Sequence, residues 1–122
     1  MTPNPSLLVR TKHYSLLIIR LYSDLPGGVV AQCLGKQLLR SGTSVGAQLR
    51  ESRRSRSRAE MISKTESALQ ELEESVYWIE LLQESGHLQD SSIEPLLEES
   101  NQLIAILVSG VRTLKSRKSA GS

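Results

Sequence analysis

Few residues in the sequence have the chemistry and the spacing that catalysis needs. The two histidines, His13 and His87, are separated by most of the chain, and each is expected to be a surface or turn residue. Together with the single cysteine, Cys33, they supply too few ligands for a Cys/His zinc site. Cys33 lies among small and aliphatic residues, so we expect it to be buried. No glycine-rich phosphate loop or nucleophile motif occurs. The sequence therefore predicts a protein that is not an enzyme and that holds no metal and no cofactor.

A row of glutamates in the second half of the chain is the remaining candidate for chemistry. Metal sites in helix bundles use a repeated Glu-x-x-His pattern, and no such repeat occurs here. We interpret most of these glutamates as a solvated helix face, some of which pair with basic residues of a neighbouring subunit. They are Glu66, Glu71, Glu73, Glu74, Glu80 and Glu84.

Opposite charges are strongly segregated along the chain. Residues 1–64 carry 11 Lys and Arg against 3 Asp and Glu, whereas residues 65–122 carry 4 against 10. In the second half, every basic residue lies at or after Arg112. A segregation of this size creates a field that selects partners, although the net charge is only +2.

Four amphipathic helices are predicted to position these charges. Their expected bounds are approximately 6–24, 29–54, 58–85 and 92–116, and residues 117–122 are expected to be a flexible tail. The run Pro26-Gly27-Gly28 breaks the chain between the first two helices. Ser57 and Glu60 have the spacing of a capping box at the start of the third helix.

The composition predicts a single helical domain, residues 1–122. Hydrophobic residues make up 39% of the chain but aromatic residues only 3%, with no Phe, which favours an aliphatic core and argues against a β-sandwich or barrel. Four helices with short connections favour an all-α, antiparallel up-down-up-down four-helix bundle. Residues 41–47 are almost all small, so we expect a neighbouring helix to approach them closely. The residues expected to face the core are Leu7, Tyr14, Ile18 and Leu21; Leu34, Leu38, Val45 and Leu49; Ile62, Leu69, Leu72, Val76, Ile79 and Leu82; and Leu97, Ile104, Leu107, Val111 and Leu114.

The expected topology gathers most of the positive charge at one end of the bundle. The amino terminus, the turn between the second and third helices, and the carboxyl terminus would all meet there. Twelve of the 15 basic residues belong to these segments. Such a surface binds phosphate backbones through counterion release, without reading bases. The predicted nucleic-acid-binding residues are Arg10, Lys12, Arg50, Arg53, Arg54, Arg56, Arg58, Lys64, Arg112, Lys115, Arg117 and Lys118.

One helix carries more apolar surface than a monomeric bundle needs. Tyr77, Trp78 and Leu81 lie off the inner stripe of the third helix, on a face shared with Glu74. Trp and Tyr are enriched at subunit interfaces, so we interpret these four residues as an oligomer interface. The alternative is that Trp78 covers the edge of its own bundle.

The chain shows no sign of a membrane or an export segment. Its longest uncharged stretch, residues 100–111, falls short of the roughly 18 residues that a membrane span needs. The amino terminus has two prolines and early charges in place of an apolar signal core. We expect a soluble, cytoplasmic protein with no membrane partner.

Several motifs of the chain resemble those of the bacterial four-helix bundle protein family. The main motif is QLLRSGTSVGAQLRE at residues 37–51, followed by SRAEMISK at 57–64, ALQE at 68–71 and SVYWIELL at 75–82; the NP at residues 4–5 also fits. The family includes ribosomal RNA intervening-sequence (S23-like) proteins and the accessory variability proteins (Avd) of diversity-generating retroelements. It usually has Asn at the position of Gln48.

The resemblance implies a left-handed antiparallel bundle that assembles into a homopentamer and has no enzymatic activity. In the retroelement members, the ring is positively charged, binds nucleic acid and docks a reverse transcriptase. The resemblance therefore favours a non-catalytic oligomeric accessory protein that binds RNA or DNA, with a reverse transcriptase as a further partner. The alternative is a homo-oligomeric protein-interaction scaffold whose basic segments pair with glutamates of adjacent subunits and have no nucleic-acid role.

Overall fold

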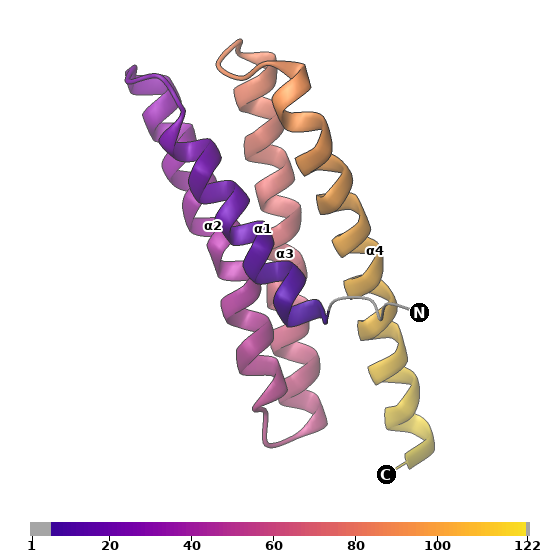
Figure 1. The fold of residues 1–122 in the computed structure, drawn as a ribbon. Coiled ribbons are helices and arrows are strands. Elements are labelled where there is room, and N and C mark those ends of the chain that lie inside the picture. The colour runs from indigo at the N-terminus through magenta and orange to yellow at the C-terminus, as the bar shows by residue number, and fades with distance from the viewer. Residues whose placement is uncertain (1–5, 122) are drawn as a thin grey trace.

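Four α-helices run alternately up and down along one axis (Figure 1). The computed structural model describes the backbone of residues 6–121 and the side chains of residues 6–117. The helices are α1 (Leu7–Ser23), α2 (Val29–Arg53), α3 (Arg58–Glu84) and α4 (Asp90–Gly121). All regular secondary structure in this part of the chain is helical. The prediction of an all-α four-helix bundle is thus confirmed. No helix among the described residues combines the length and the apolar character needed to cross a membrane.

Local capping interactions set most of the helix ends. The Ser6 hydroxyl accepts a hydrogen bond from the backbone N–H of Val9 at 3.2 Å, and the Ser57 hydroxyl accepts one from Glu60 at 3.1 Å. Both bonds satisfy amide groups that a helix start otherwise leaves without partners. At the end of α3, Gly86 adopts a φ of +83°, and the following backbone N–H, of His87, donates to the carbonyl of Leu82.

The fourth helix differs from its prediction at both ends. It begins at Asp90, two residues before the expected start, because the Gln83 side chain bonds the Asp90 carboxylate at 2.7 Å and an acidic residue suits the first turn of a helix. The backbone also remains helical through Gly121, five residues beyond the expected end at residue 116. The segment contains no proline that would stop the helix.

The core is aliphatic, but the buried stripe on α4 differs from the predicted one. Ile93, Leu96 and Leu103 are buried, whereas the expected Leu97 and Ile104 are only half-buried. The true stripe passes through Ser100, a polar residue that the hydrophobic pattern avoided. The other expected core residues that are half-buried are Leu7, Leu21, Leu34, Leu69, Val76 and Leu114.

Small residues let α1 and α2 approach closely, as the run at residues 41–47 predicted. A Cβ atom placed on Gly42 would lie 2.7 Å from the Ile18 side chain, and one on Gly46 would lie 3.5 Å from the backbone oxygen of Thr11. The contact therefore requires glycine at residue 42, whereas a Cβ atom at residue 46 would make an ordinary van der Waals contact. The loss of helix propensity at each glycine, about 1 kcal/mol, is offset by the packing that it permits.

A chain of buried hydroxyl groups joins all four helices. The Tyr14 hydroxyl of α1 bonds Ser100 of α4 at 2.8 Å, and it lies within hydrogen-bonding reach of Ser75 of α3. Ser75 in turn bonds Ser41 of α2 at 2.8 Å. Burial of Tyr14 raises the pKa of its hydroxyl to about 12, since the low-dielectric core disfavours the phenolate.

The first helix is much shorter than the other three. It has 17 residues, whereas α2, α3 and α4 have 25, 27 and 32. At 1.5 Å per residue, α1 covers roughly 26 Å, so it begins well above the turn between α2 and α3 (Figure 1). Below its start, α2, α3 and α4 enclose an open cavity whose lining includes Leu7, Leu49, Met61, Ile106 and Leu114.

Candidate nucleic-acid interface

The topology brings the predicted basic segments toward one end of the molecule. The turn between α2 and α3 and the carboxyl end of α4 lie together at the lower end in Figure 1. Arg53 of α2 and Arg117 of α4 line the same cavity, and Lys115 of α4 lies 3.0 Å from Glu66 of α3. The first residues of α1 are set back from this end because α1 is short.

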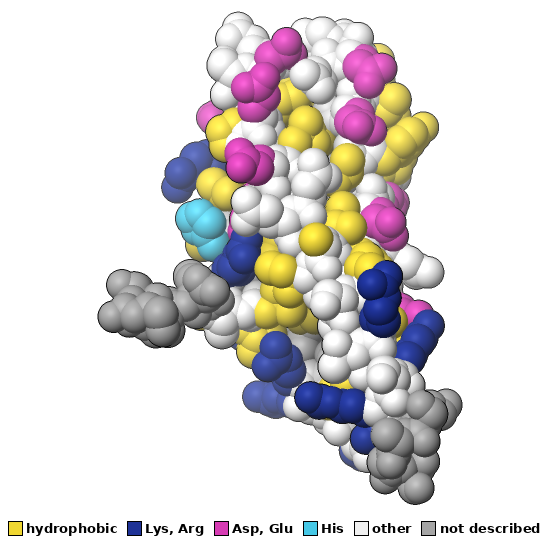
Figure 2. Space-filling view, turned by 90° about the vertical axis from the view of Figure 1, so that its right-hand side faces the viewer, with side chains coloured by type: hydrophobic (Ala, Val, Ile, Leu, Met, Phe, Trp, Pro, Cys, Tyr) yellow, Lys and Arg dark blue, Asp and Glu magenta, His cyan; other side chains and the backbone are white. Residues whose placement is uncertain are grey.

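The charge distribution on the surface follows the topology. In the view of Figure 2, most Lys and Arg side chains lie over the lower half of the molecule and most Asp and Glu side chains over the upper half. The segregation along the sequence thus becomes a segregation in space. A phosphate backbone would meet an attractive field mainly at the lower end.

Three of the twelve predicted cations are held in ion pairs within the chain. Arg10 lies 2.6 Å from Glu99 of α4, Lys64 lies 2.7 Å from Glu51, and Lys115 pairs with Glu66 as described above. Hydrogen bonds to Glu99 raise the pKa of the Arg10 guanidinium, and the bond to Glu51 raises the pKa of the Lys64 ammonium.

Arg10 in particular ties α1 to α4, because its guanidinium also donates to Gln102 at 3.1 Å. Each of these three residues thus neutralises a nearby carboxylate of its own chain, and its contact with nucleic acid stays a prediction. Lys118 lies outside the residues whose side chains are described.

Eight of the predicted cations remain, since three of the twelve are paired and Lys118 is not described. None of the eight has an ion pair with a described residue. All are exposed except Arg58, which is half-buried. We call them the cationic end: Lys12, Arg50, Arg53, Arg54, Arg56, Arg58, Arg112 and Arg117.

Four of these cations line a groove between α1 and α2. Lys12 and Arg50 flank a hollow whose other lining residues are Ser15, Gly46 and Ala47. Arg50 continues into an adjoining hollow that Arg53 and Arg54 also line, together with Leu8 and Glu51. The Glu51 carboxylate is already neutralised by its pairing with Lys64. We call this region, with Lys12, Arg50, Arg53 and Arg54 along it, the α1–α2 groove.

Small side chains make this groove, and sequence reasoning did not place them at the site. Gly46 and Ala47 were recognised as part of a small-residue run, but only as helix-packing residues. The sequence signal for the groove was the pair Arg50 and Arg54, which follow Ala47 by three and seven residues. A small-residue floor beside a row of cations allows an extended anion to approach the helix backbone closely.

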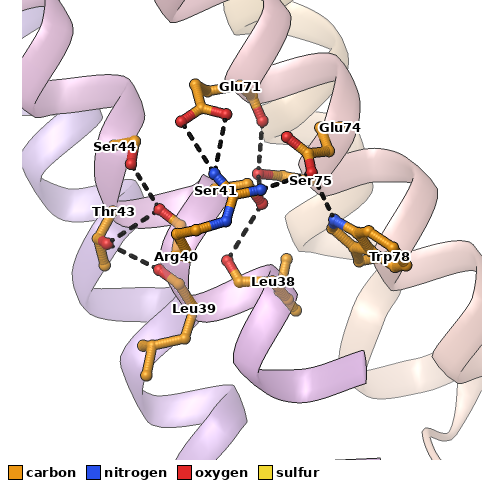
Figure 3. Close-up of polar contacts among 10 residues, drawn as sticks. All are labelled: Leu38, Leu39, Arg40, Ser41, Thr43, Ser44, Glu71, Glu74, Ser75 and Trp78. Carbon is orange, nitrogen blue, oxygen red and sulfur yellow. Dashed lines mark hydrogen bonds and ion pairs between the residues drawn. The ribbon is translucent and has the colours of Figure 1, made fainter. Parts of the chain in front are cut away.

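The remaining basic residues, Arg20, Lys36 and Arg40, lie outside the cationic end. Arg40 of α2 bonds the carboxylates of Glu71 at 3.3 Å and Glu74 at 2.5 Å (Figure 3). The indole N–H of Trp78 also donates to Glu74, at 3.2 Å. Burial alone would raise the pKa of the Glu74 carboxyl, but the bonds from Arg40 and Trp78 outweigh it, and the pKa lies below its usual range.

These contacts bear on the predicted oligomer interface. Glu74 accepts hydrogen bonds from Arg40 and from Trp78 of its own chain, and Trp78 is half-buried against the core. Tyr77 is 54% exposed and packs edge-on against the Trp78 ring, with centroids 5.2 Å apart. Leu81 is half-buried. Tyr77 is therefore the member of the predicted interface that leaves the most surface for a partner.

The structure also places two further residues of α2, Cys33 and Gln48. Cys33 is exposed on α2, so the prediction that it is buried was wrong; α2 turns its adjacent Ala31 and Leu38 inward instead. Gln48 is half-buried, and its side-chain oxygen is buried without a hydrogen-bond partner among the described residues.

The residues with catalytic chemistry do not converge. His13 is exposed, and the His87 ring bonds Ser85 at 2.8 Å in the turn after α3. Within the part of the chain that the structure describes, no group of three or more His, Cys, Asp and Glu side chains could hold a metal ion.

The fold and its charged end define a small helical-bundle protein with a cationic pole. Comparison with known proteins is more specific: residues 8–109 match the family described as 23S rRNA-intervening sequence protein. A solved structure, a protein of unknown function from the S23 ribosomal protein family of Bacteroides thetaiotaomicron VPI-5482, is 31% identical, with a TM-score of 0.79. The likeness covers 87% of this chain and 98% of that one. No curated protein sequence matches significantly. The chain thus belongs to the 23S rRNA-intervening sequence protein family.

Proposed function

We propose that this protein is a non-catalytic, oligomeric accessory protein that binds RNA or DNA through phosphate contacts at its cationic end. One observation carries the proposal: eight basic side chains at one end have no ion-pair partner among the described residues, and four of them follow the α1–α2 groove. Unpaired cations are free to replace the counterions of a nucleic acid.

The groove supports binding to the backbone and not to the bases. Its lining has no aromatic residue on which a base could stack. Lys12 on α1, Arg50 on α2 and Arg54 directly after α2 present charge from two sides of the groove, which suits a run of phosphates better than a single anion. The proposal therefore predicts little sequence preference and a strong dependence on salt.

Self-assembly strengthens the proposed interaction. A homopentamer, the assembly that the resemblance implies, would repeat the cationic end five times, and multivalent display turns weak phosphate contacts into useful affinity. A ring of this kind would also offer a docking surface to a second protein. We include a reverse transcriptase of a diversity-generating retroelement as the partner to test first in this role.

The proposal is tested by measuring the binding of the full-length protein to short duplex DNA and to structured RNA at several salt concentrations. We expect binding at about 50 mM salt whose affinity falls steeply as salt increases. Absence of binding to both nucleic acids at the lowest salt would overturn it.

A specific observation favours a second function, a homo-oligomeric interaction scaffold without a nucleic-acid role. The exposed carboxylates of Glu73, Glu80 and Glu84 on α3 have no ion pair among the described residues, so they are available to basic residues of another subunit. Reversing the charges of Arg53, Arg54 and Arg56 separates the two functions. Dissociation of the oligomer favours the scaffold, whereas loss of nucleic-acid binding by an intact oligomer supports the main proposal.

A further inference from the structure

The outer face of α1 is apolar and basic, and no residue in the described part of the chain covers it. Val9, Leu16 and Ile19 are 60%, 51% and 43% exposed, although the opposite side of the same helix is fully buried. Lys12 and Arg20 are exposed between them. The helix contains no acidic residue at all. Large apolar side chains that recur on one exposed helix face indicate a contact surface.

The outer face of α3 has the complementary chemistry. Glu73, Tyr77, Glu80 and Glu84 follow one another at intervals of four, three and four residues, so they lie on one side of the helix, and all four are exposed. No basic residue occurs in α3 after Lys64. Glu66, about two turns before Glu73 on this side, is already neutralised by Lys115. The free part of this face is therefore acidic, with one aromatic ring at its centre.

The two faces match in length and cannot meet within one molecule. The α1 face runs from Val9 to Arg20 and the α3 face from Glu73 to Glu84, and each spans roughly 16 Å at 1.5 Å per residue. The two helices lie diagonally across the bundle, with α2 and α4 packed between them, so their outer faces point away from each other. The complementary charge of either face must therefore come from another molecule.

We infer that the outer face of α1 in one copy of this chain docks against the outer face of α3 in the next copy. The inference rests on the proposed self-assembly and identifies the surfaces that carry it. Val9, Leu16 and Ile19 pack around Tyr77, and the lysine and arginine of α1 face the glutamates of α3. Because the two faces differ, the contact is heterologous, and its repetition closes into a ring if the rotation between copies permits.

The contact would also arrange the α1–α2 grooves. Lys12 belongs to both the α1 face and one side of the groove, so the groove of each subunit lies directly beside the contact with its neighbour. The cations of successive subunits would then form a continuous path. Assembly would thus extend the nucleic-acid site across neighbouring subunits, while the arginines of the groove stay outside the contact between them.

A charge-swap experiment tests the inference with two variants of the full-length protein. The first carries Lys12→Glu and Arg20→Glu on α1, and the second carries Glu73→Lys, Glu80→Lys and Glu84→Lys on α3. In each variant the α1 face and the α3 face carry charge of the same sign, so copies of one variant repel each other at the proposed contact. We expect its dissociation constant to rise about tenfold or more, measured by sedimentation velocity.

Mixing the two variants provides the decisive arm. Each contact between unlike variants then joins opposite charges again, so the mixture should associate into species larger than either variant forms alone, although a closed ring with an odd number of subunits, such as a pentamer, keeps one like-charge contact. Lys36→Glu and Glu98→Lys, exposed on α2 and α4 outside both faces, serve as controls and should assemble normally. Circular dichroism of each variant checks that the bundle remains folded.

Three outcomes would overturn the inference: a monomeric wild type, swap variants that assemble as the controls do, or a mixture that stays dissociated. Nucleic-acid binding of the wild type is measured separately. A monomer that binds DNA with a steep salt dependence contradicts this interface alone. An assembly with the expected behaviour that binds neither DNA nor RNA contradicts the proposed function alone.

Discussion

Replacing Arg50 and Arg54 by glutamine should weaken nucleic-acid binding and reduce its dependence on salt, because each lost phosphate contact lowers the slope of log affinity against log salt. Both side chains are exposed, have no ion pair among the described residues and line the α1–α2 groove. Each phosphate contact to duplex DNA contributes about 0.9 to the slope of log affinity against log salt. If the seven arginines of the cationic end make one contact each while Lys12 lies at the subunit contact, the wild-type slope is about −6, and the double variant has a slope of about −4.5.

The measurement is fluorescence anisotropy of a labelled short duplex, titrated between about 50 and 200 mM salt. Over this fourfold range, the wild type should lose about four decades of affinity and the variant about three. The matched control is Lys36→Gln with Arg40→Gln. Lys36 and Arg40 have the same four-residue spacing and lie outside the cationic end; because Arg40 pairs with Glu71 and Glu74, circular dichroism checks that the control keeps the wild-type fold.

The control should keep the wild-type slope, because its residues make no phosphate contact. Equal changes of slope in the two double variants would show that binding responds to net charge and not to the groove. An unchanged slope in the variant lacking Arg50 and Arg54 would show that the groove is not the site. Either result refutes the reasoning from unpaired cations.

Three further predictions concern the stability of the bundle. Gly42→Ala places a Cβ atom 2.7 Å from a buried isoleucine of α1 and should destabilise the protein by about 1–3 kcal/mol in chemical denaturation. Gly110→Ala, whose new Cβ atom meets nothing within 4 Å, should stabilise the protein by up to about 1 kcal/mol. Destabilisation by both substitutions would contradict the packing argument. Tyr14→Phe should cost about 1 kcal/mol at neutral pH. The pKa of Tyr14 is about 12 in the folded protein and lower in the unfolded chain, so the wild type should lose stability relative to this variant as the pH rises from 10 to 12. A difference in denaturation midpoints that stays constant over this pH range would contradict the burial of the hydroxyl. Arg10→Gln should lower stability by about 1 kcal/mol through loss of the pairing with Glu99 and leave the salt slope of DNA binding unchanged, which a reduced slope would disprove.

Much of the fold could be predicted from the sequence because its signals are local. The capping serine and glutamate at residues 57 and 60 and the glycine at residue 86 act within a few residues, and the helix ends that they predicted agree with the structure to within one residue. The buried stripe of α4 was harder. Hydrophobic periodicity does not identify a buried serine, so the pattern missed Ser100. It also predicted full burial for Leu97, Ile104 and Leu114, which are only half-buried.

The candidate site could be predicted only in outline. Up-down topology is enough to gather the basic segments, but it does not say which side chains are already neutralised. The pairings of Arg10, Lys64 and Lys115 join residues that are 13 to 89 positions apart, and they depend on helix rotations that the sequence does not encode simply. The α1–α2 groove likewise depends on the close approach at Gly46, which sequence reasoning interpreted as packing alone.

The hydroxyl contacts that cross the core have a consequence for the geometry of the whole molecule. A core of similar aliphatic side chains fits almost as well after one helix slides by a turn, so hydrophobicity alone leaves several alignments close in energy. The Tyr14 hydroxyl has no bonding partner on its own helix and reaches Ser100 at one offset only. It therefore selects a single alignment of α1 against the other helices. The width of the groove and the height at which Lys12 stands opposite Arg50 are, in this sense, set by one tyrosine in the interior.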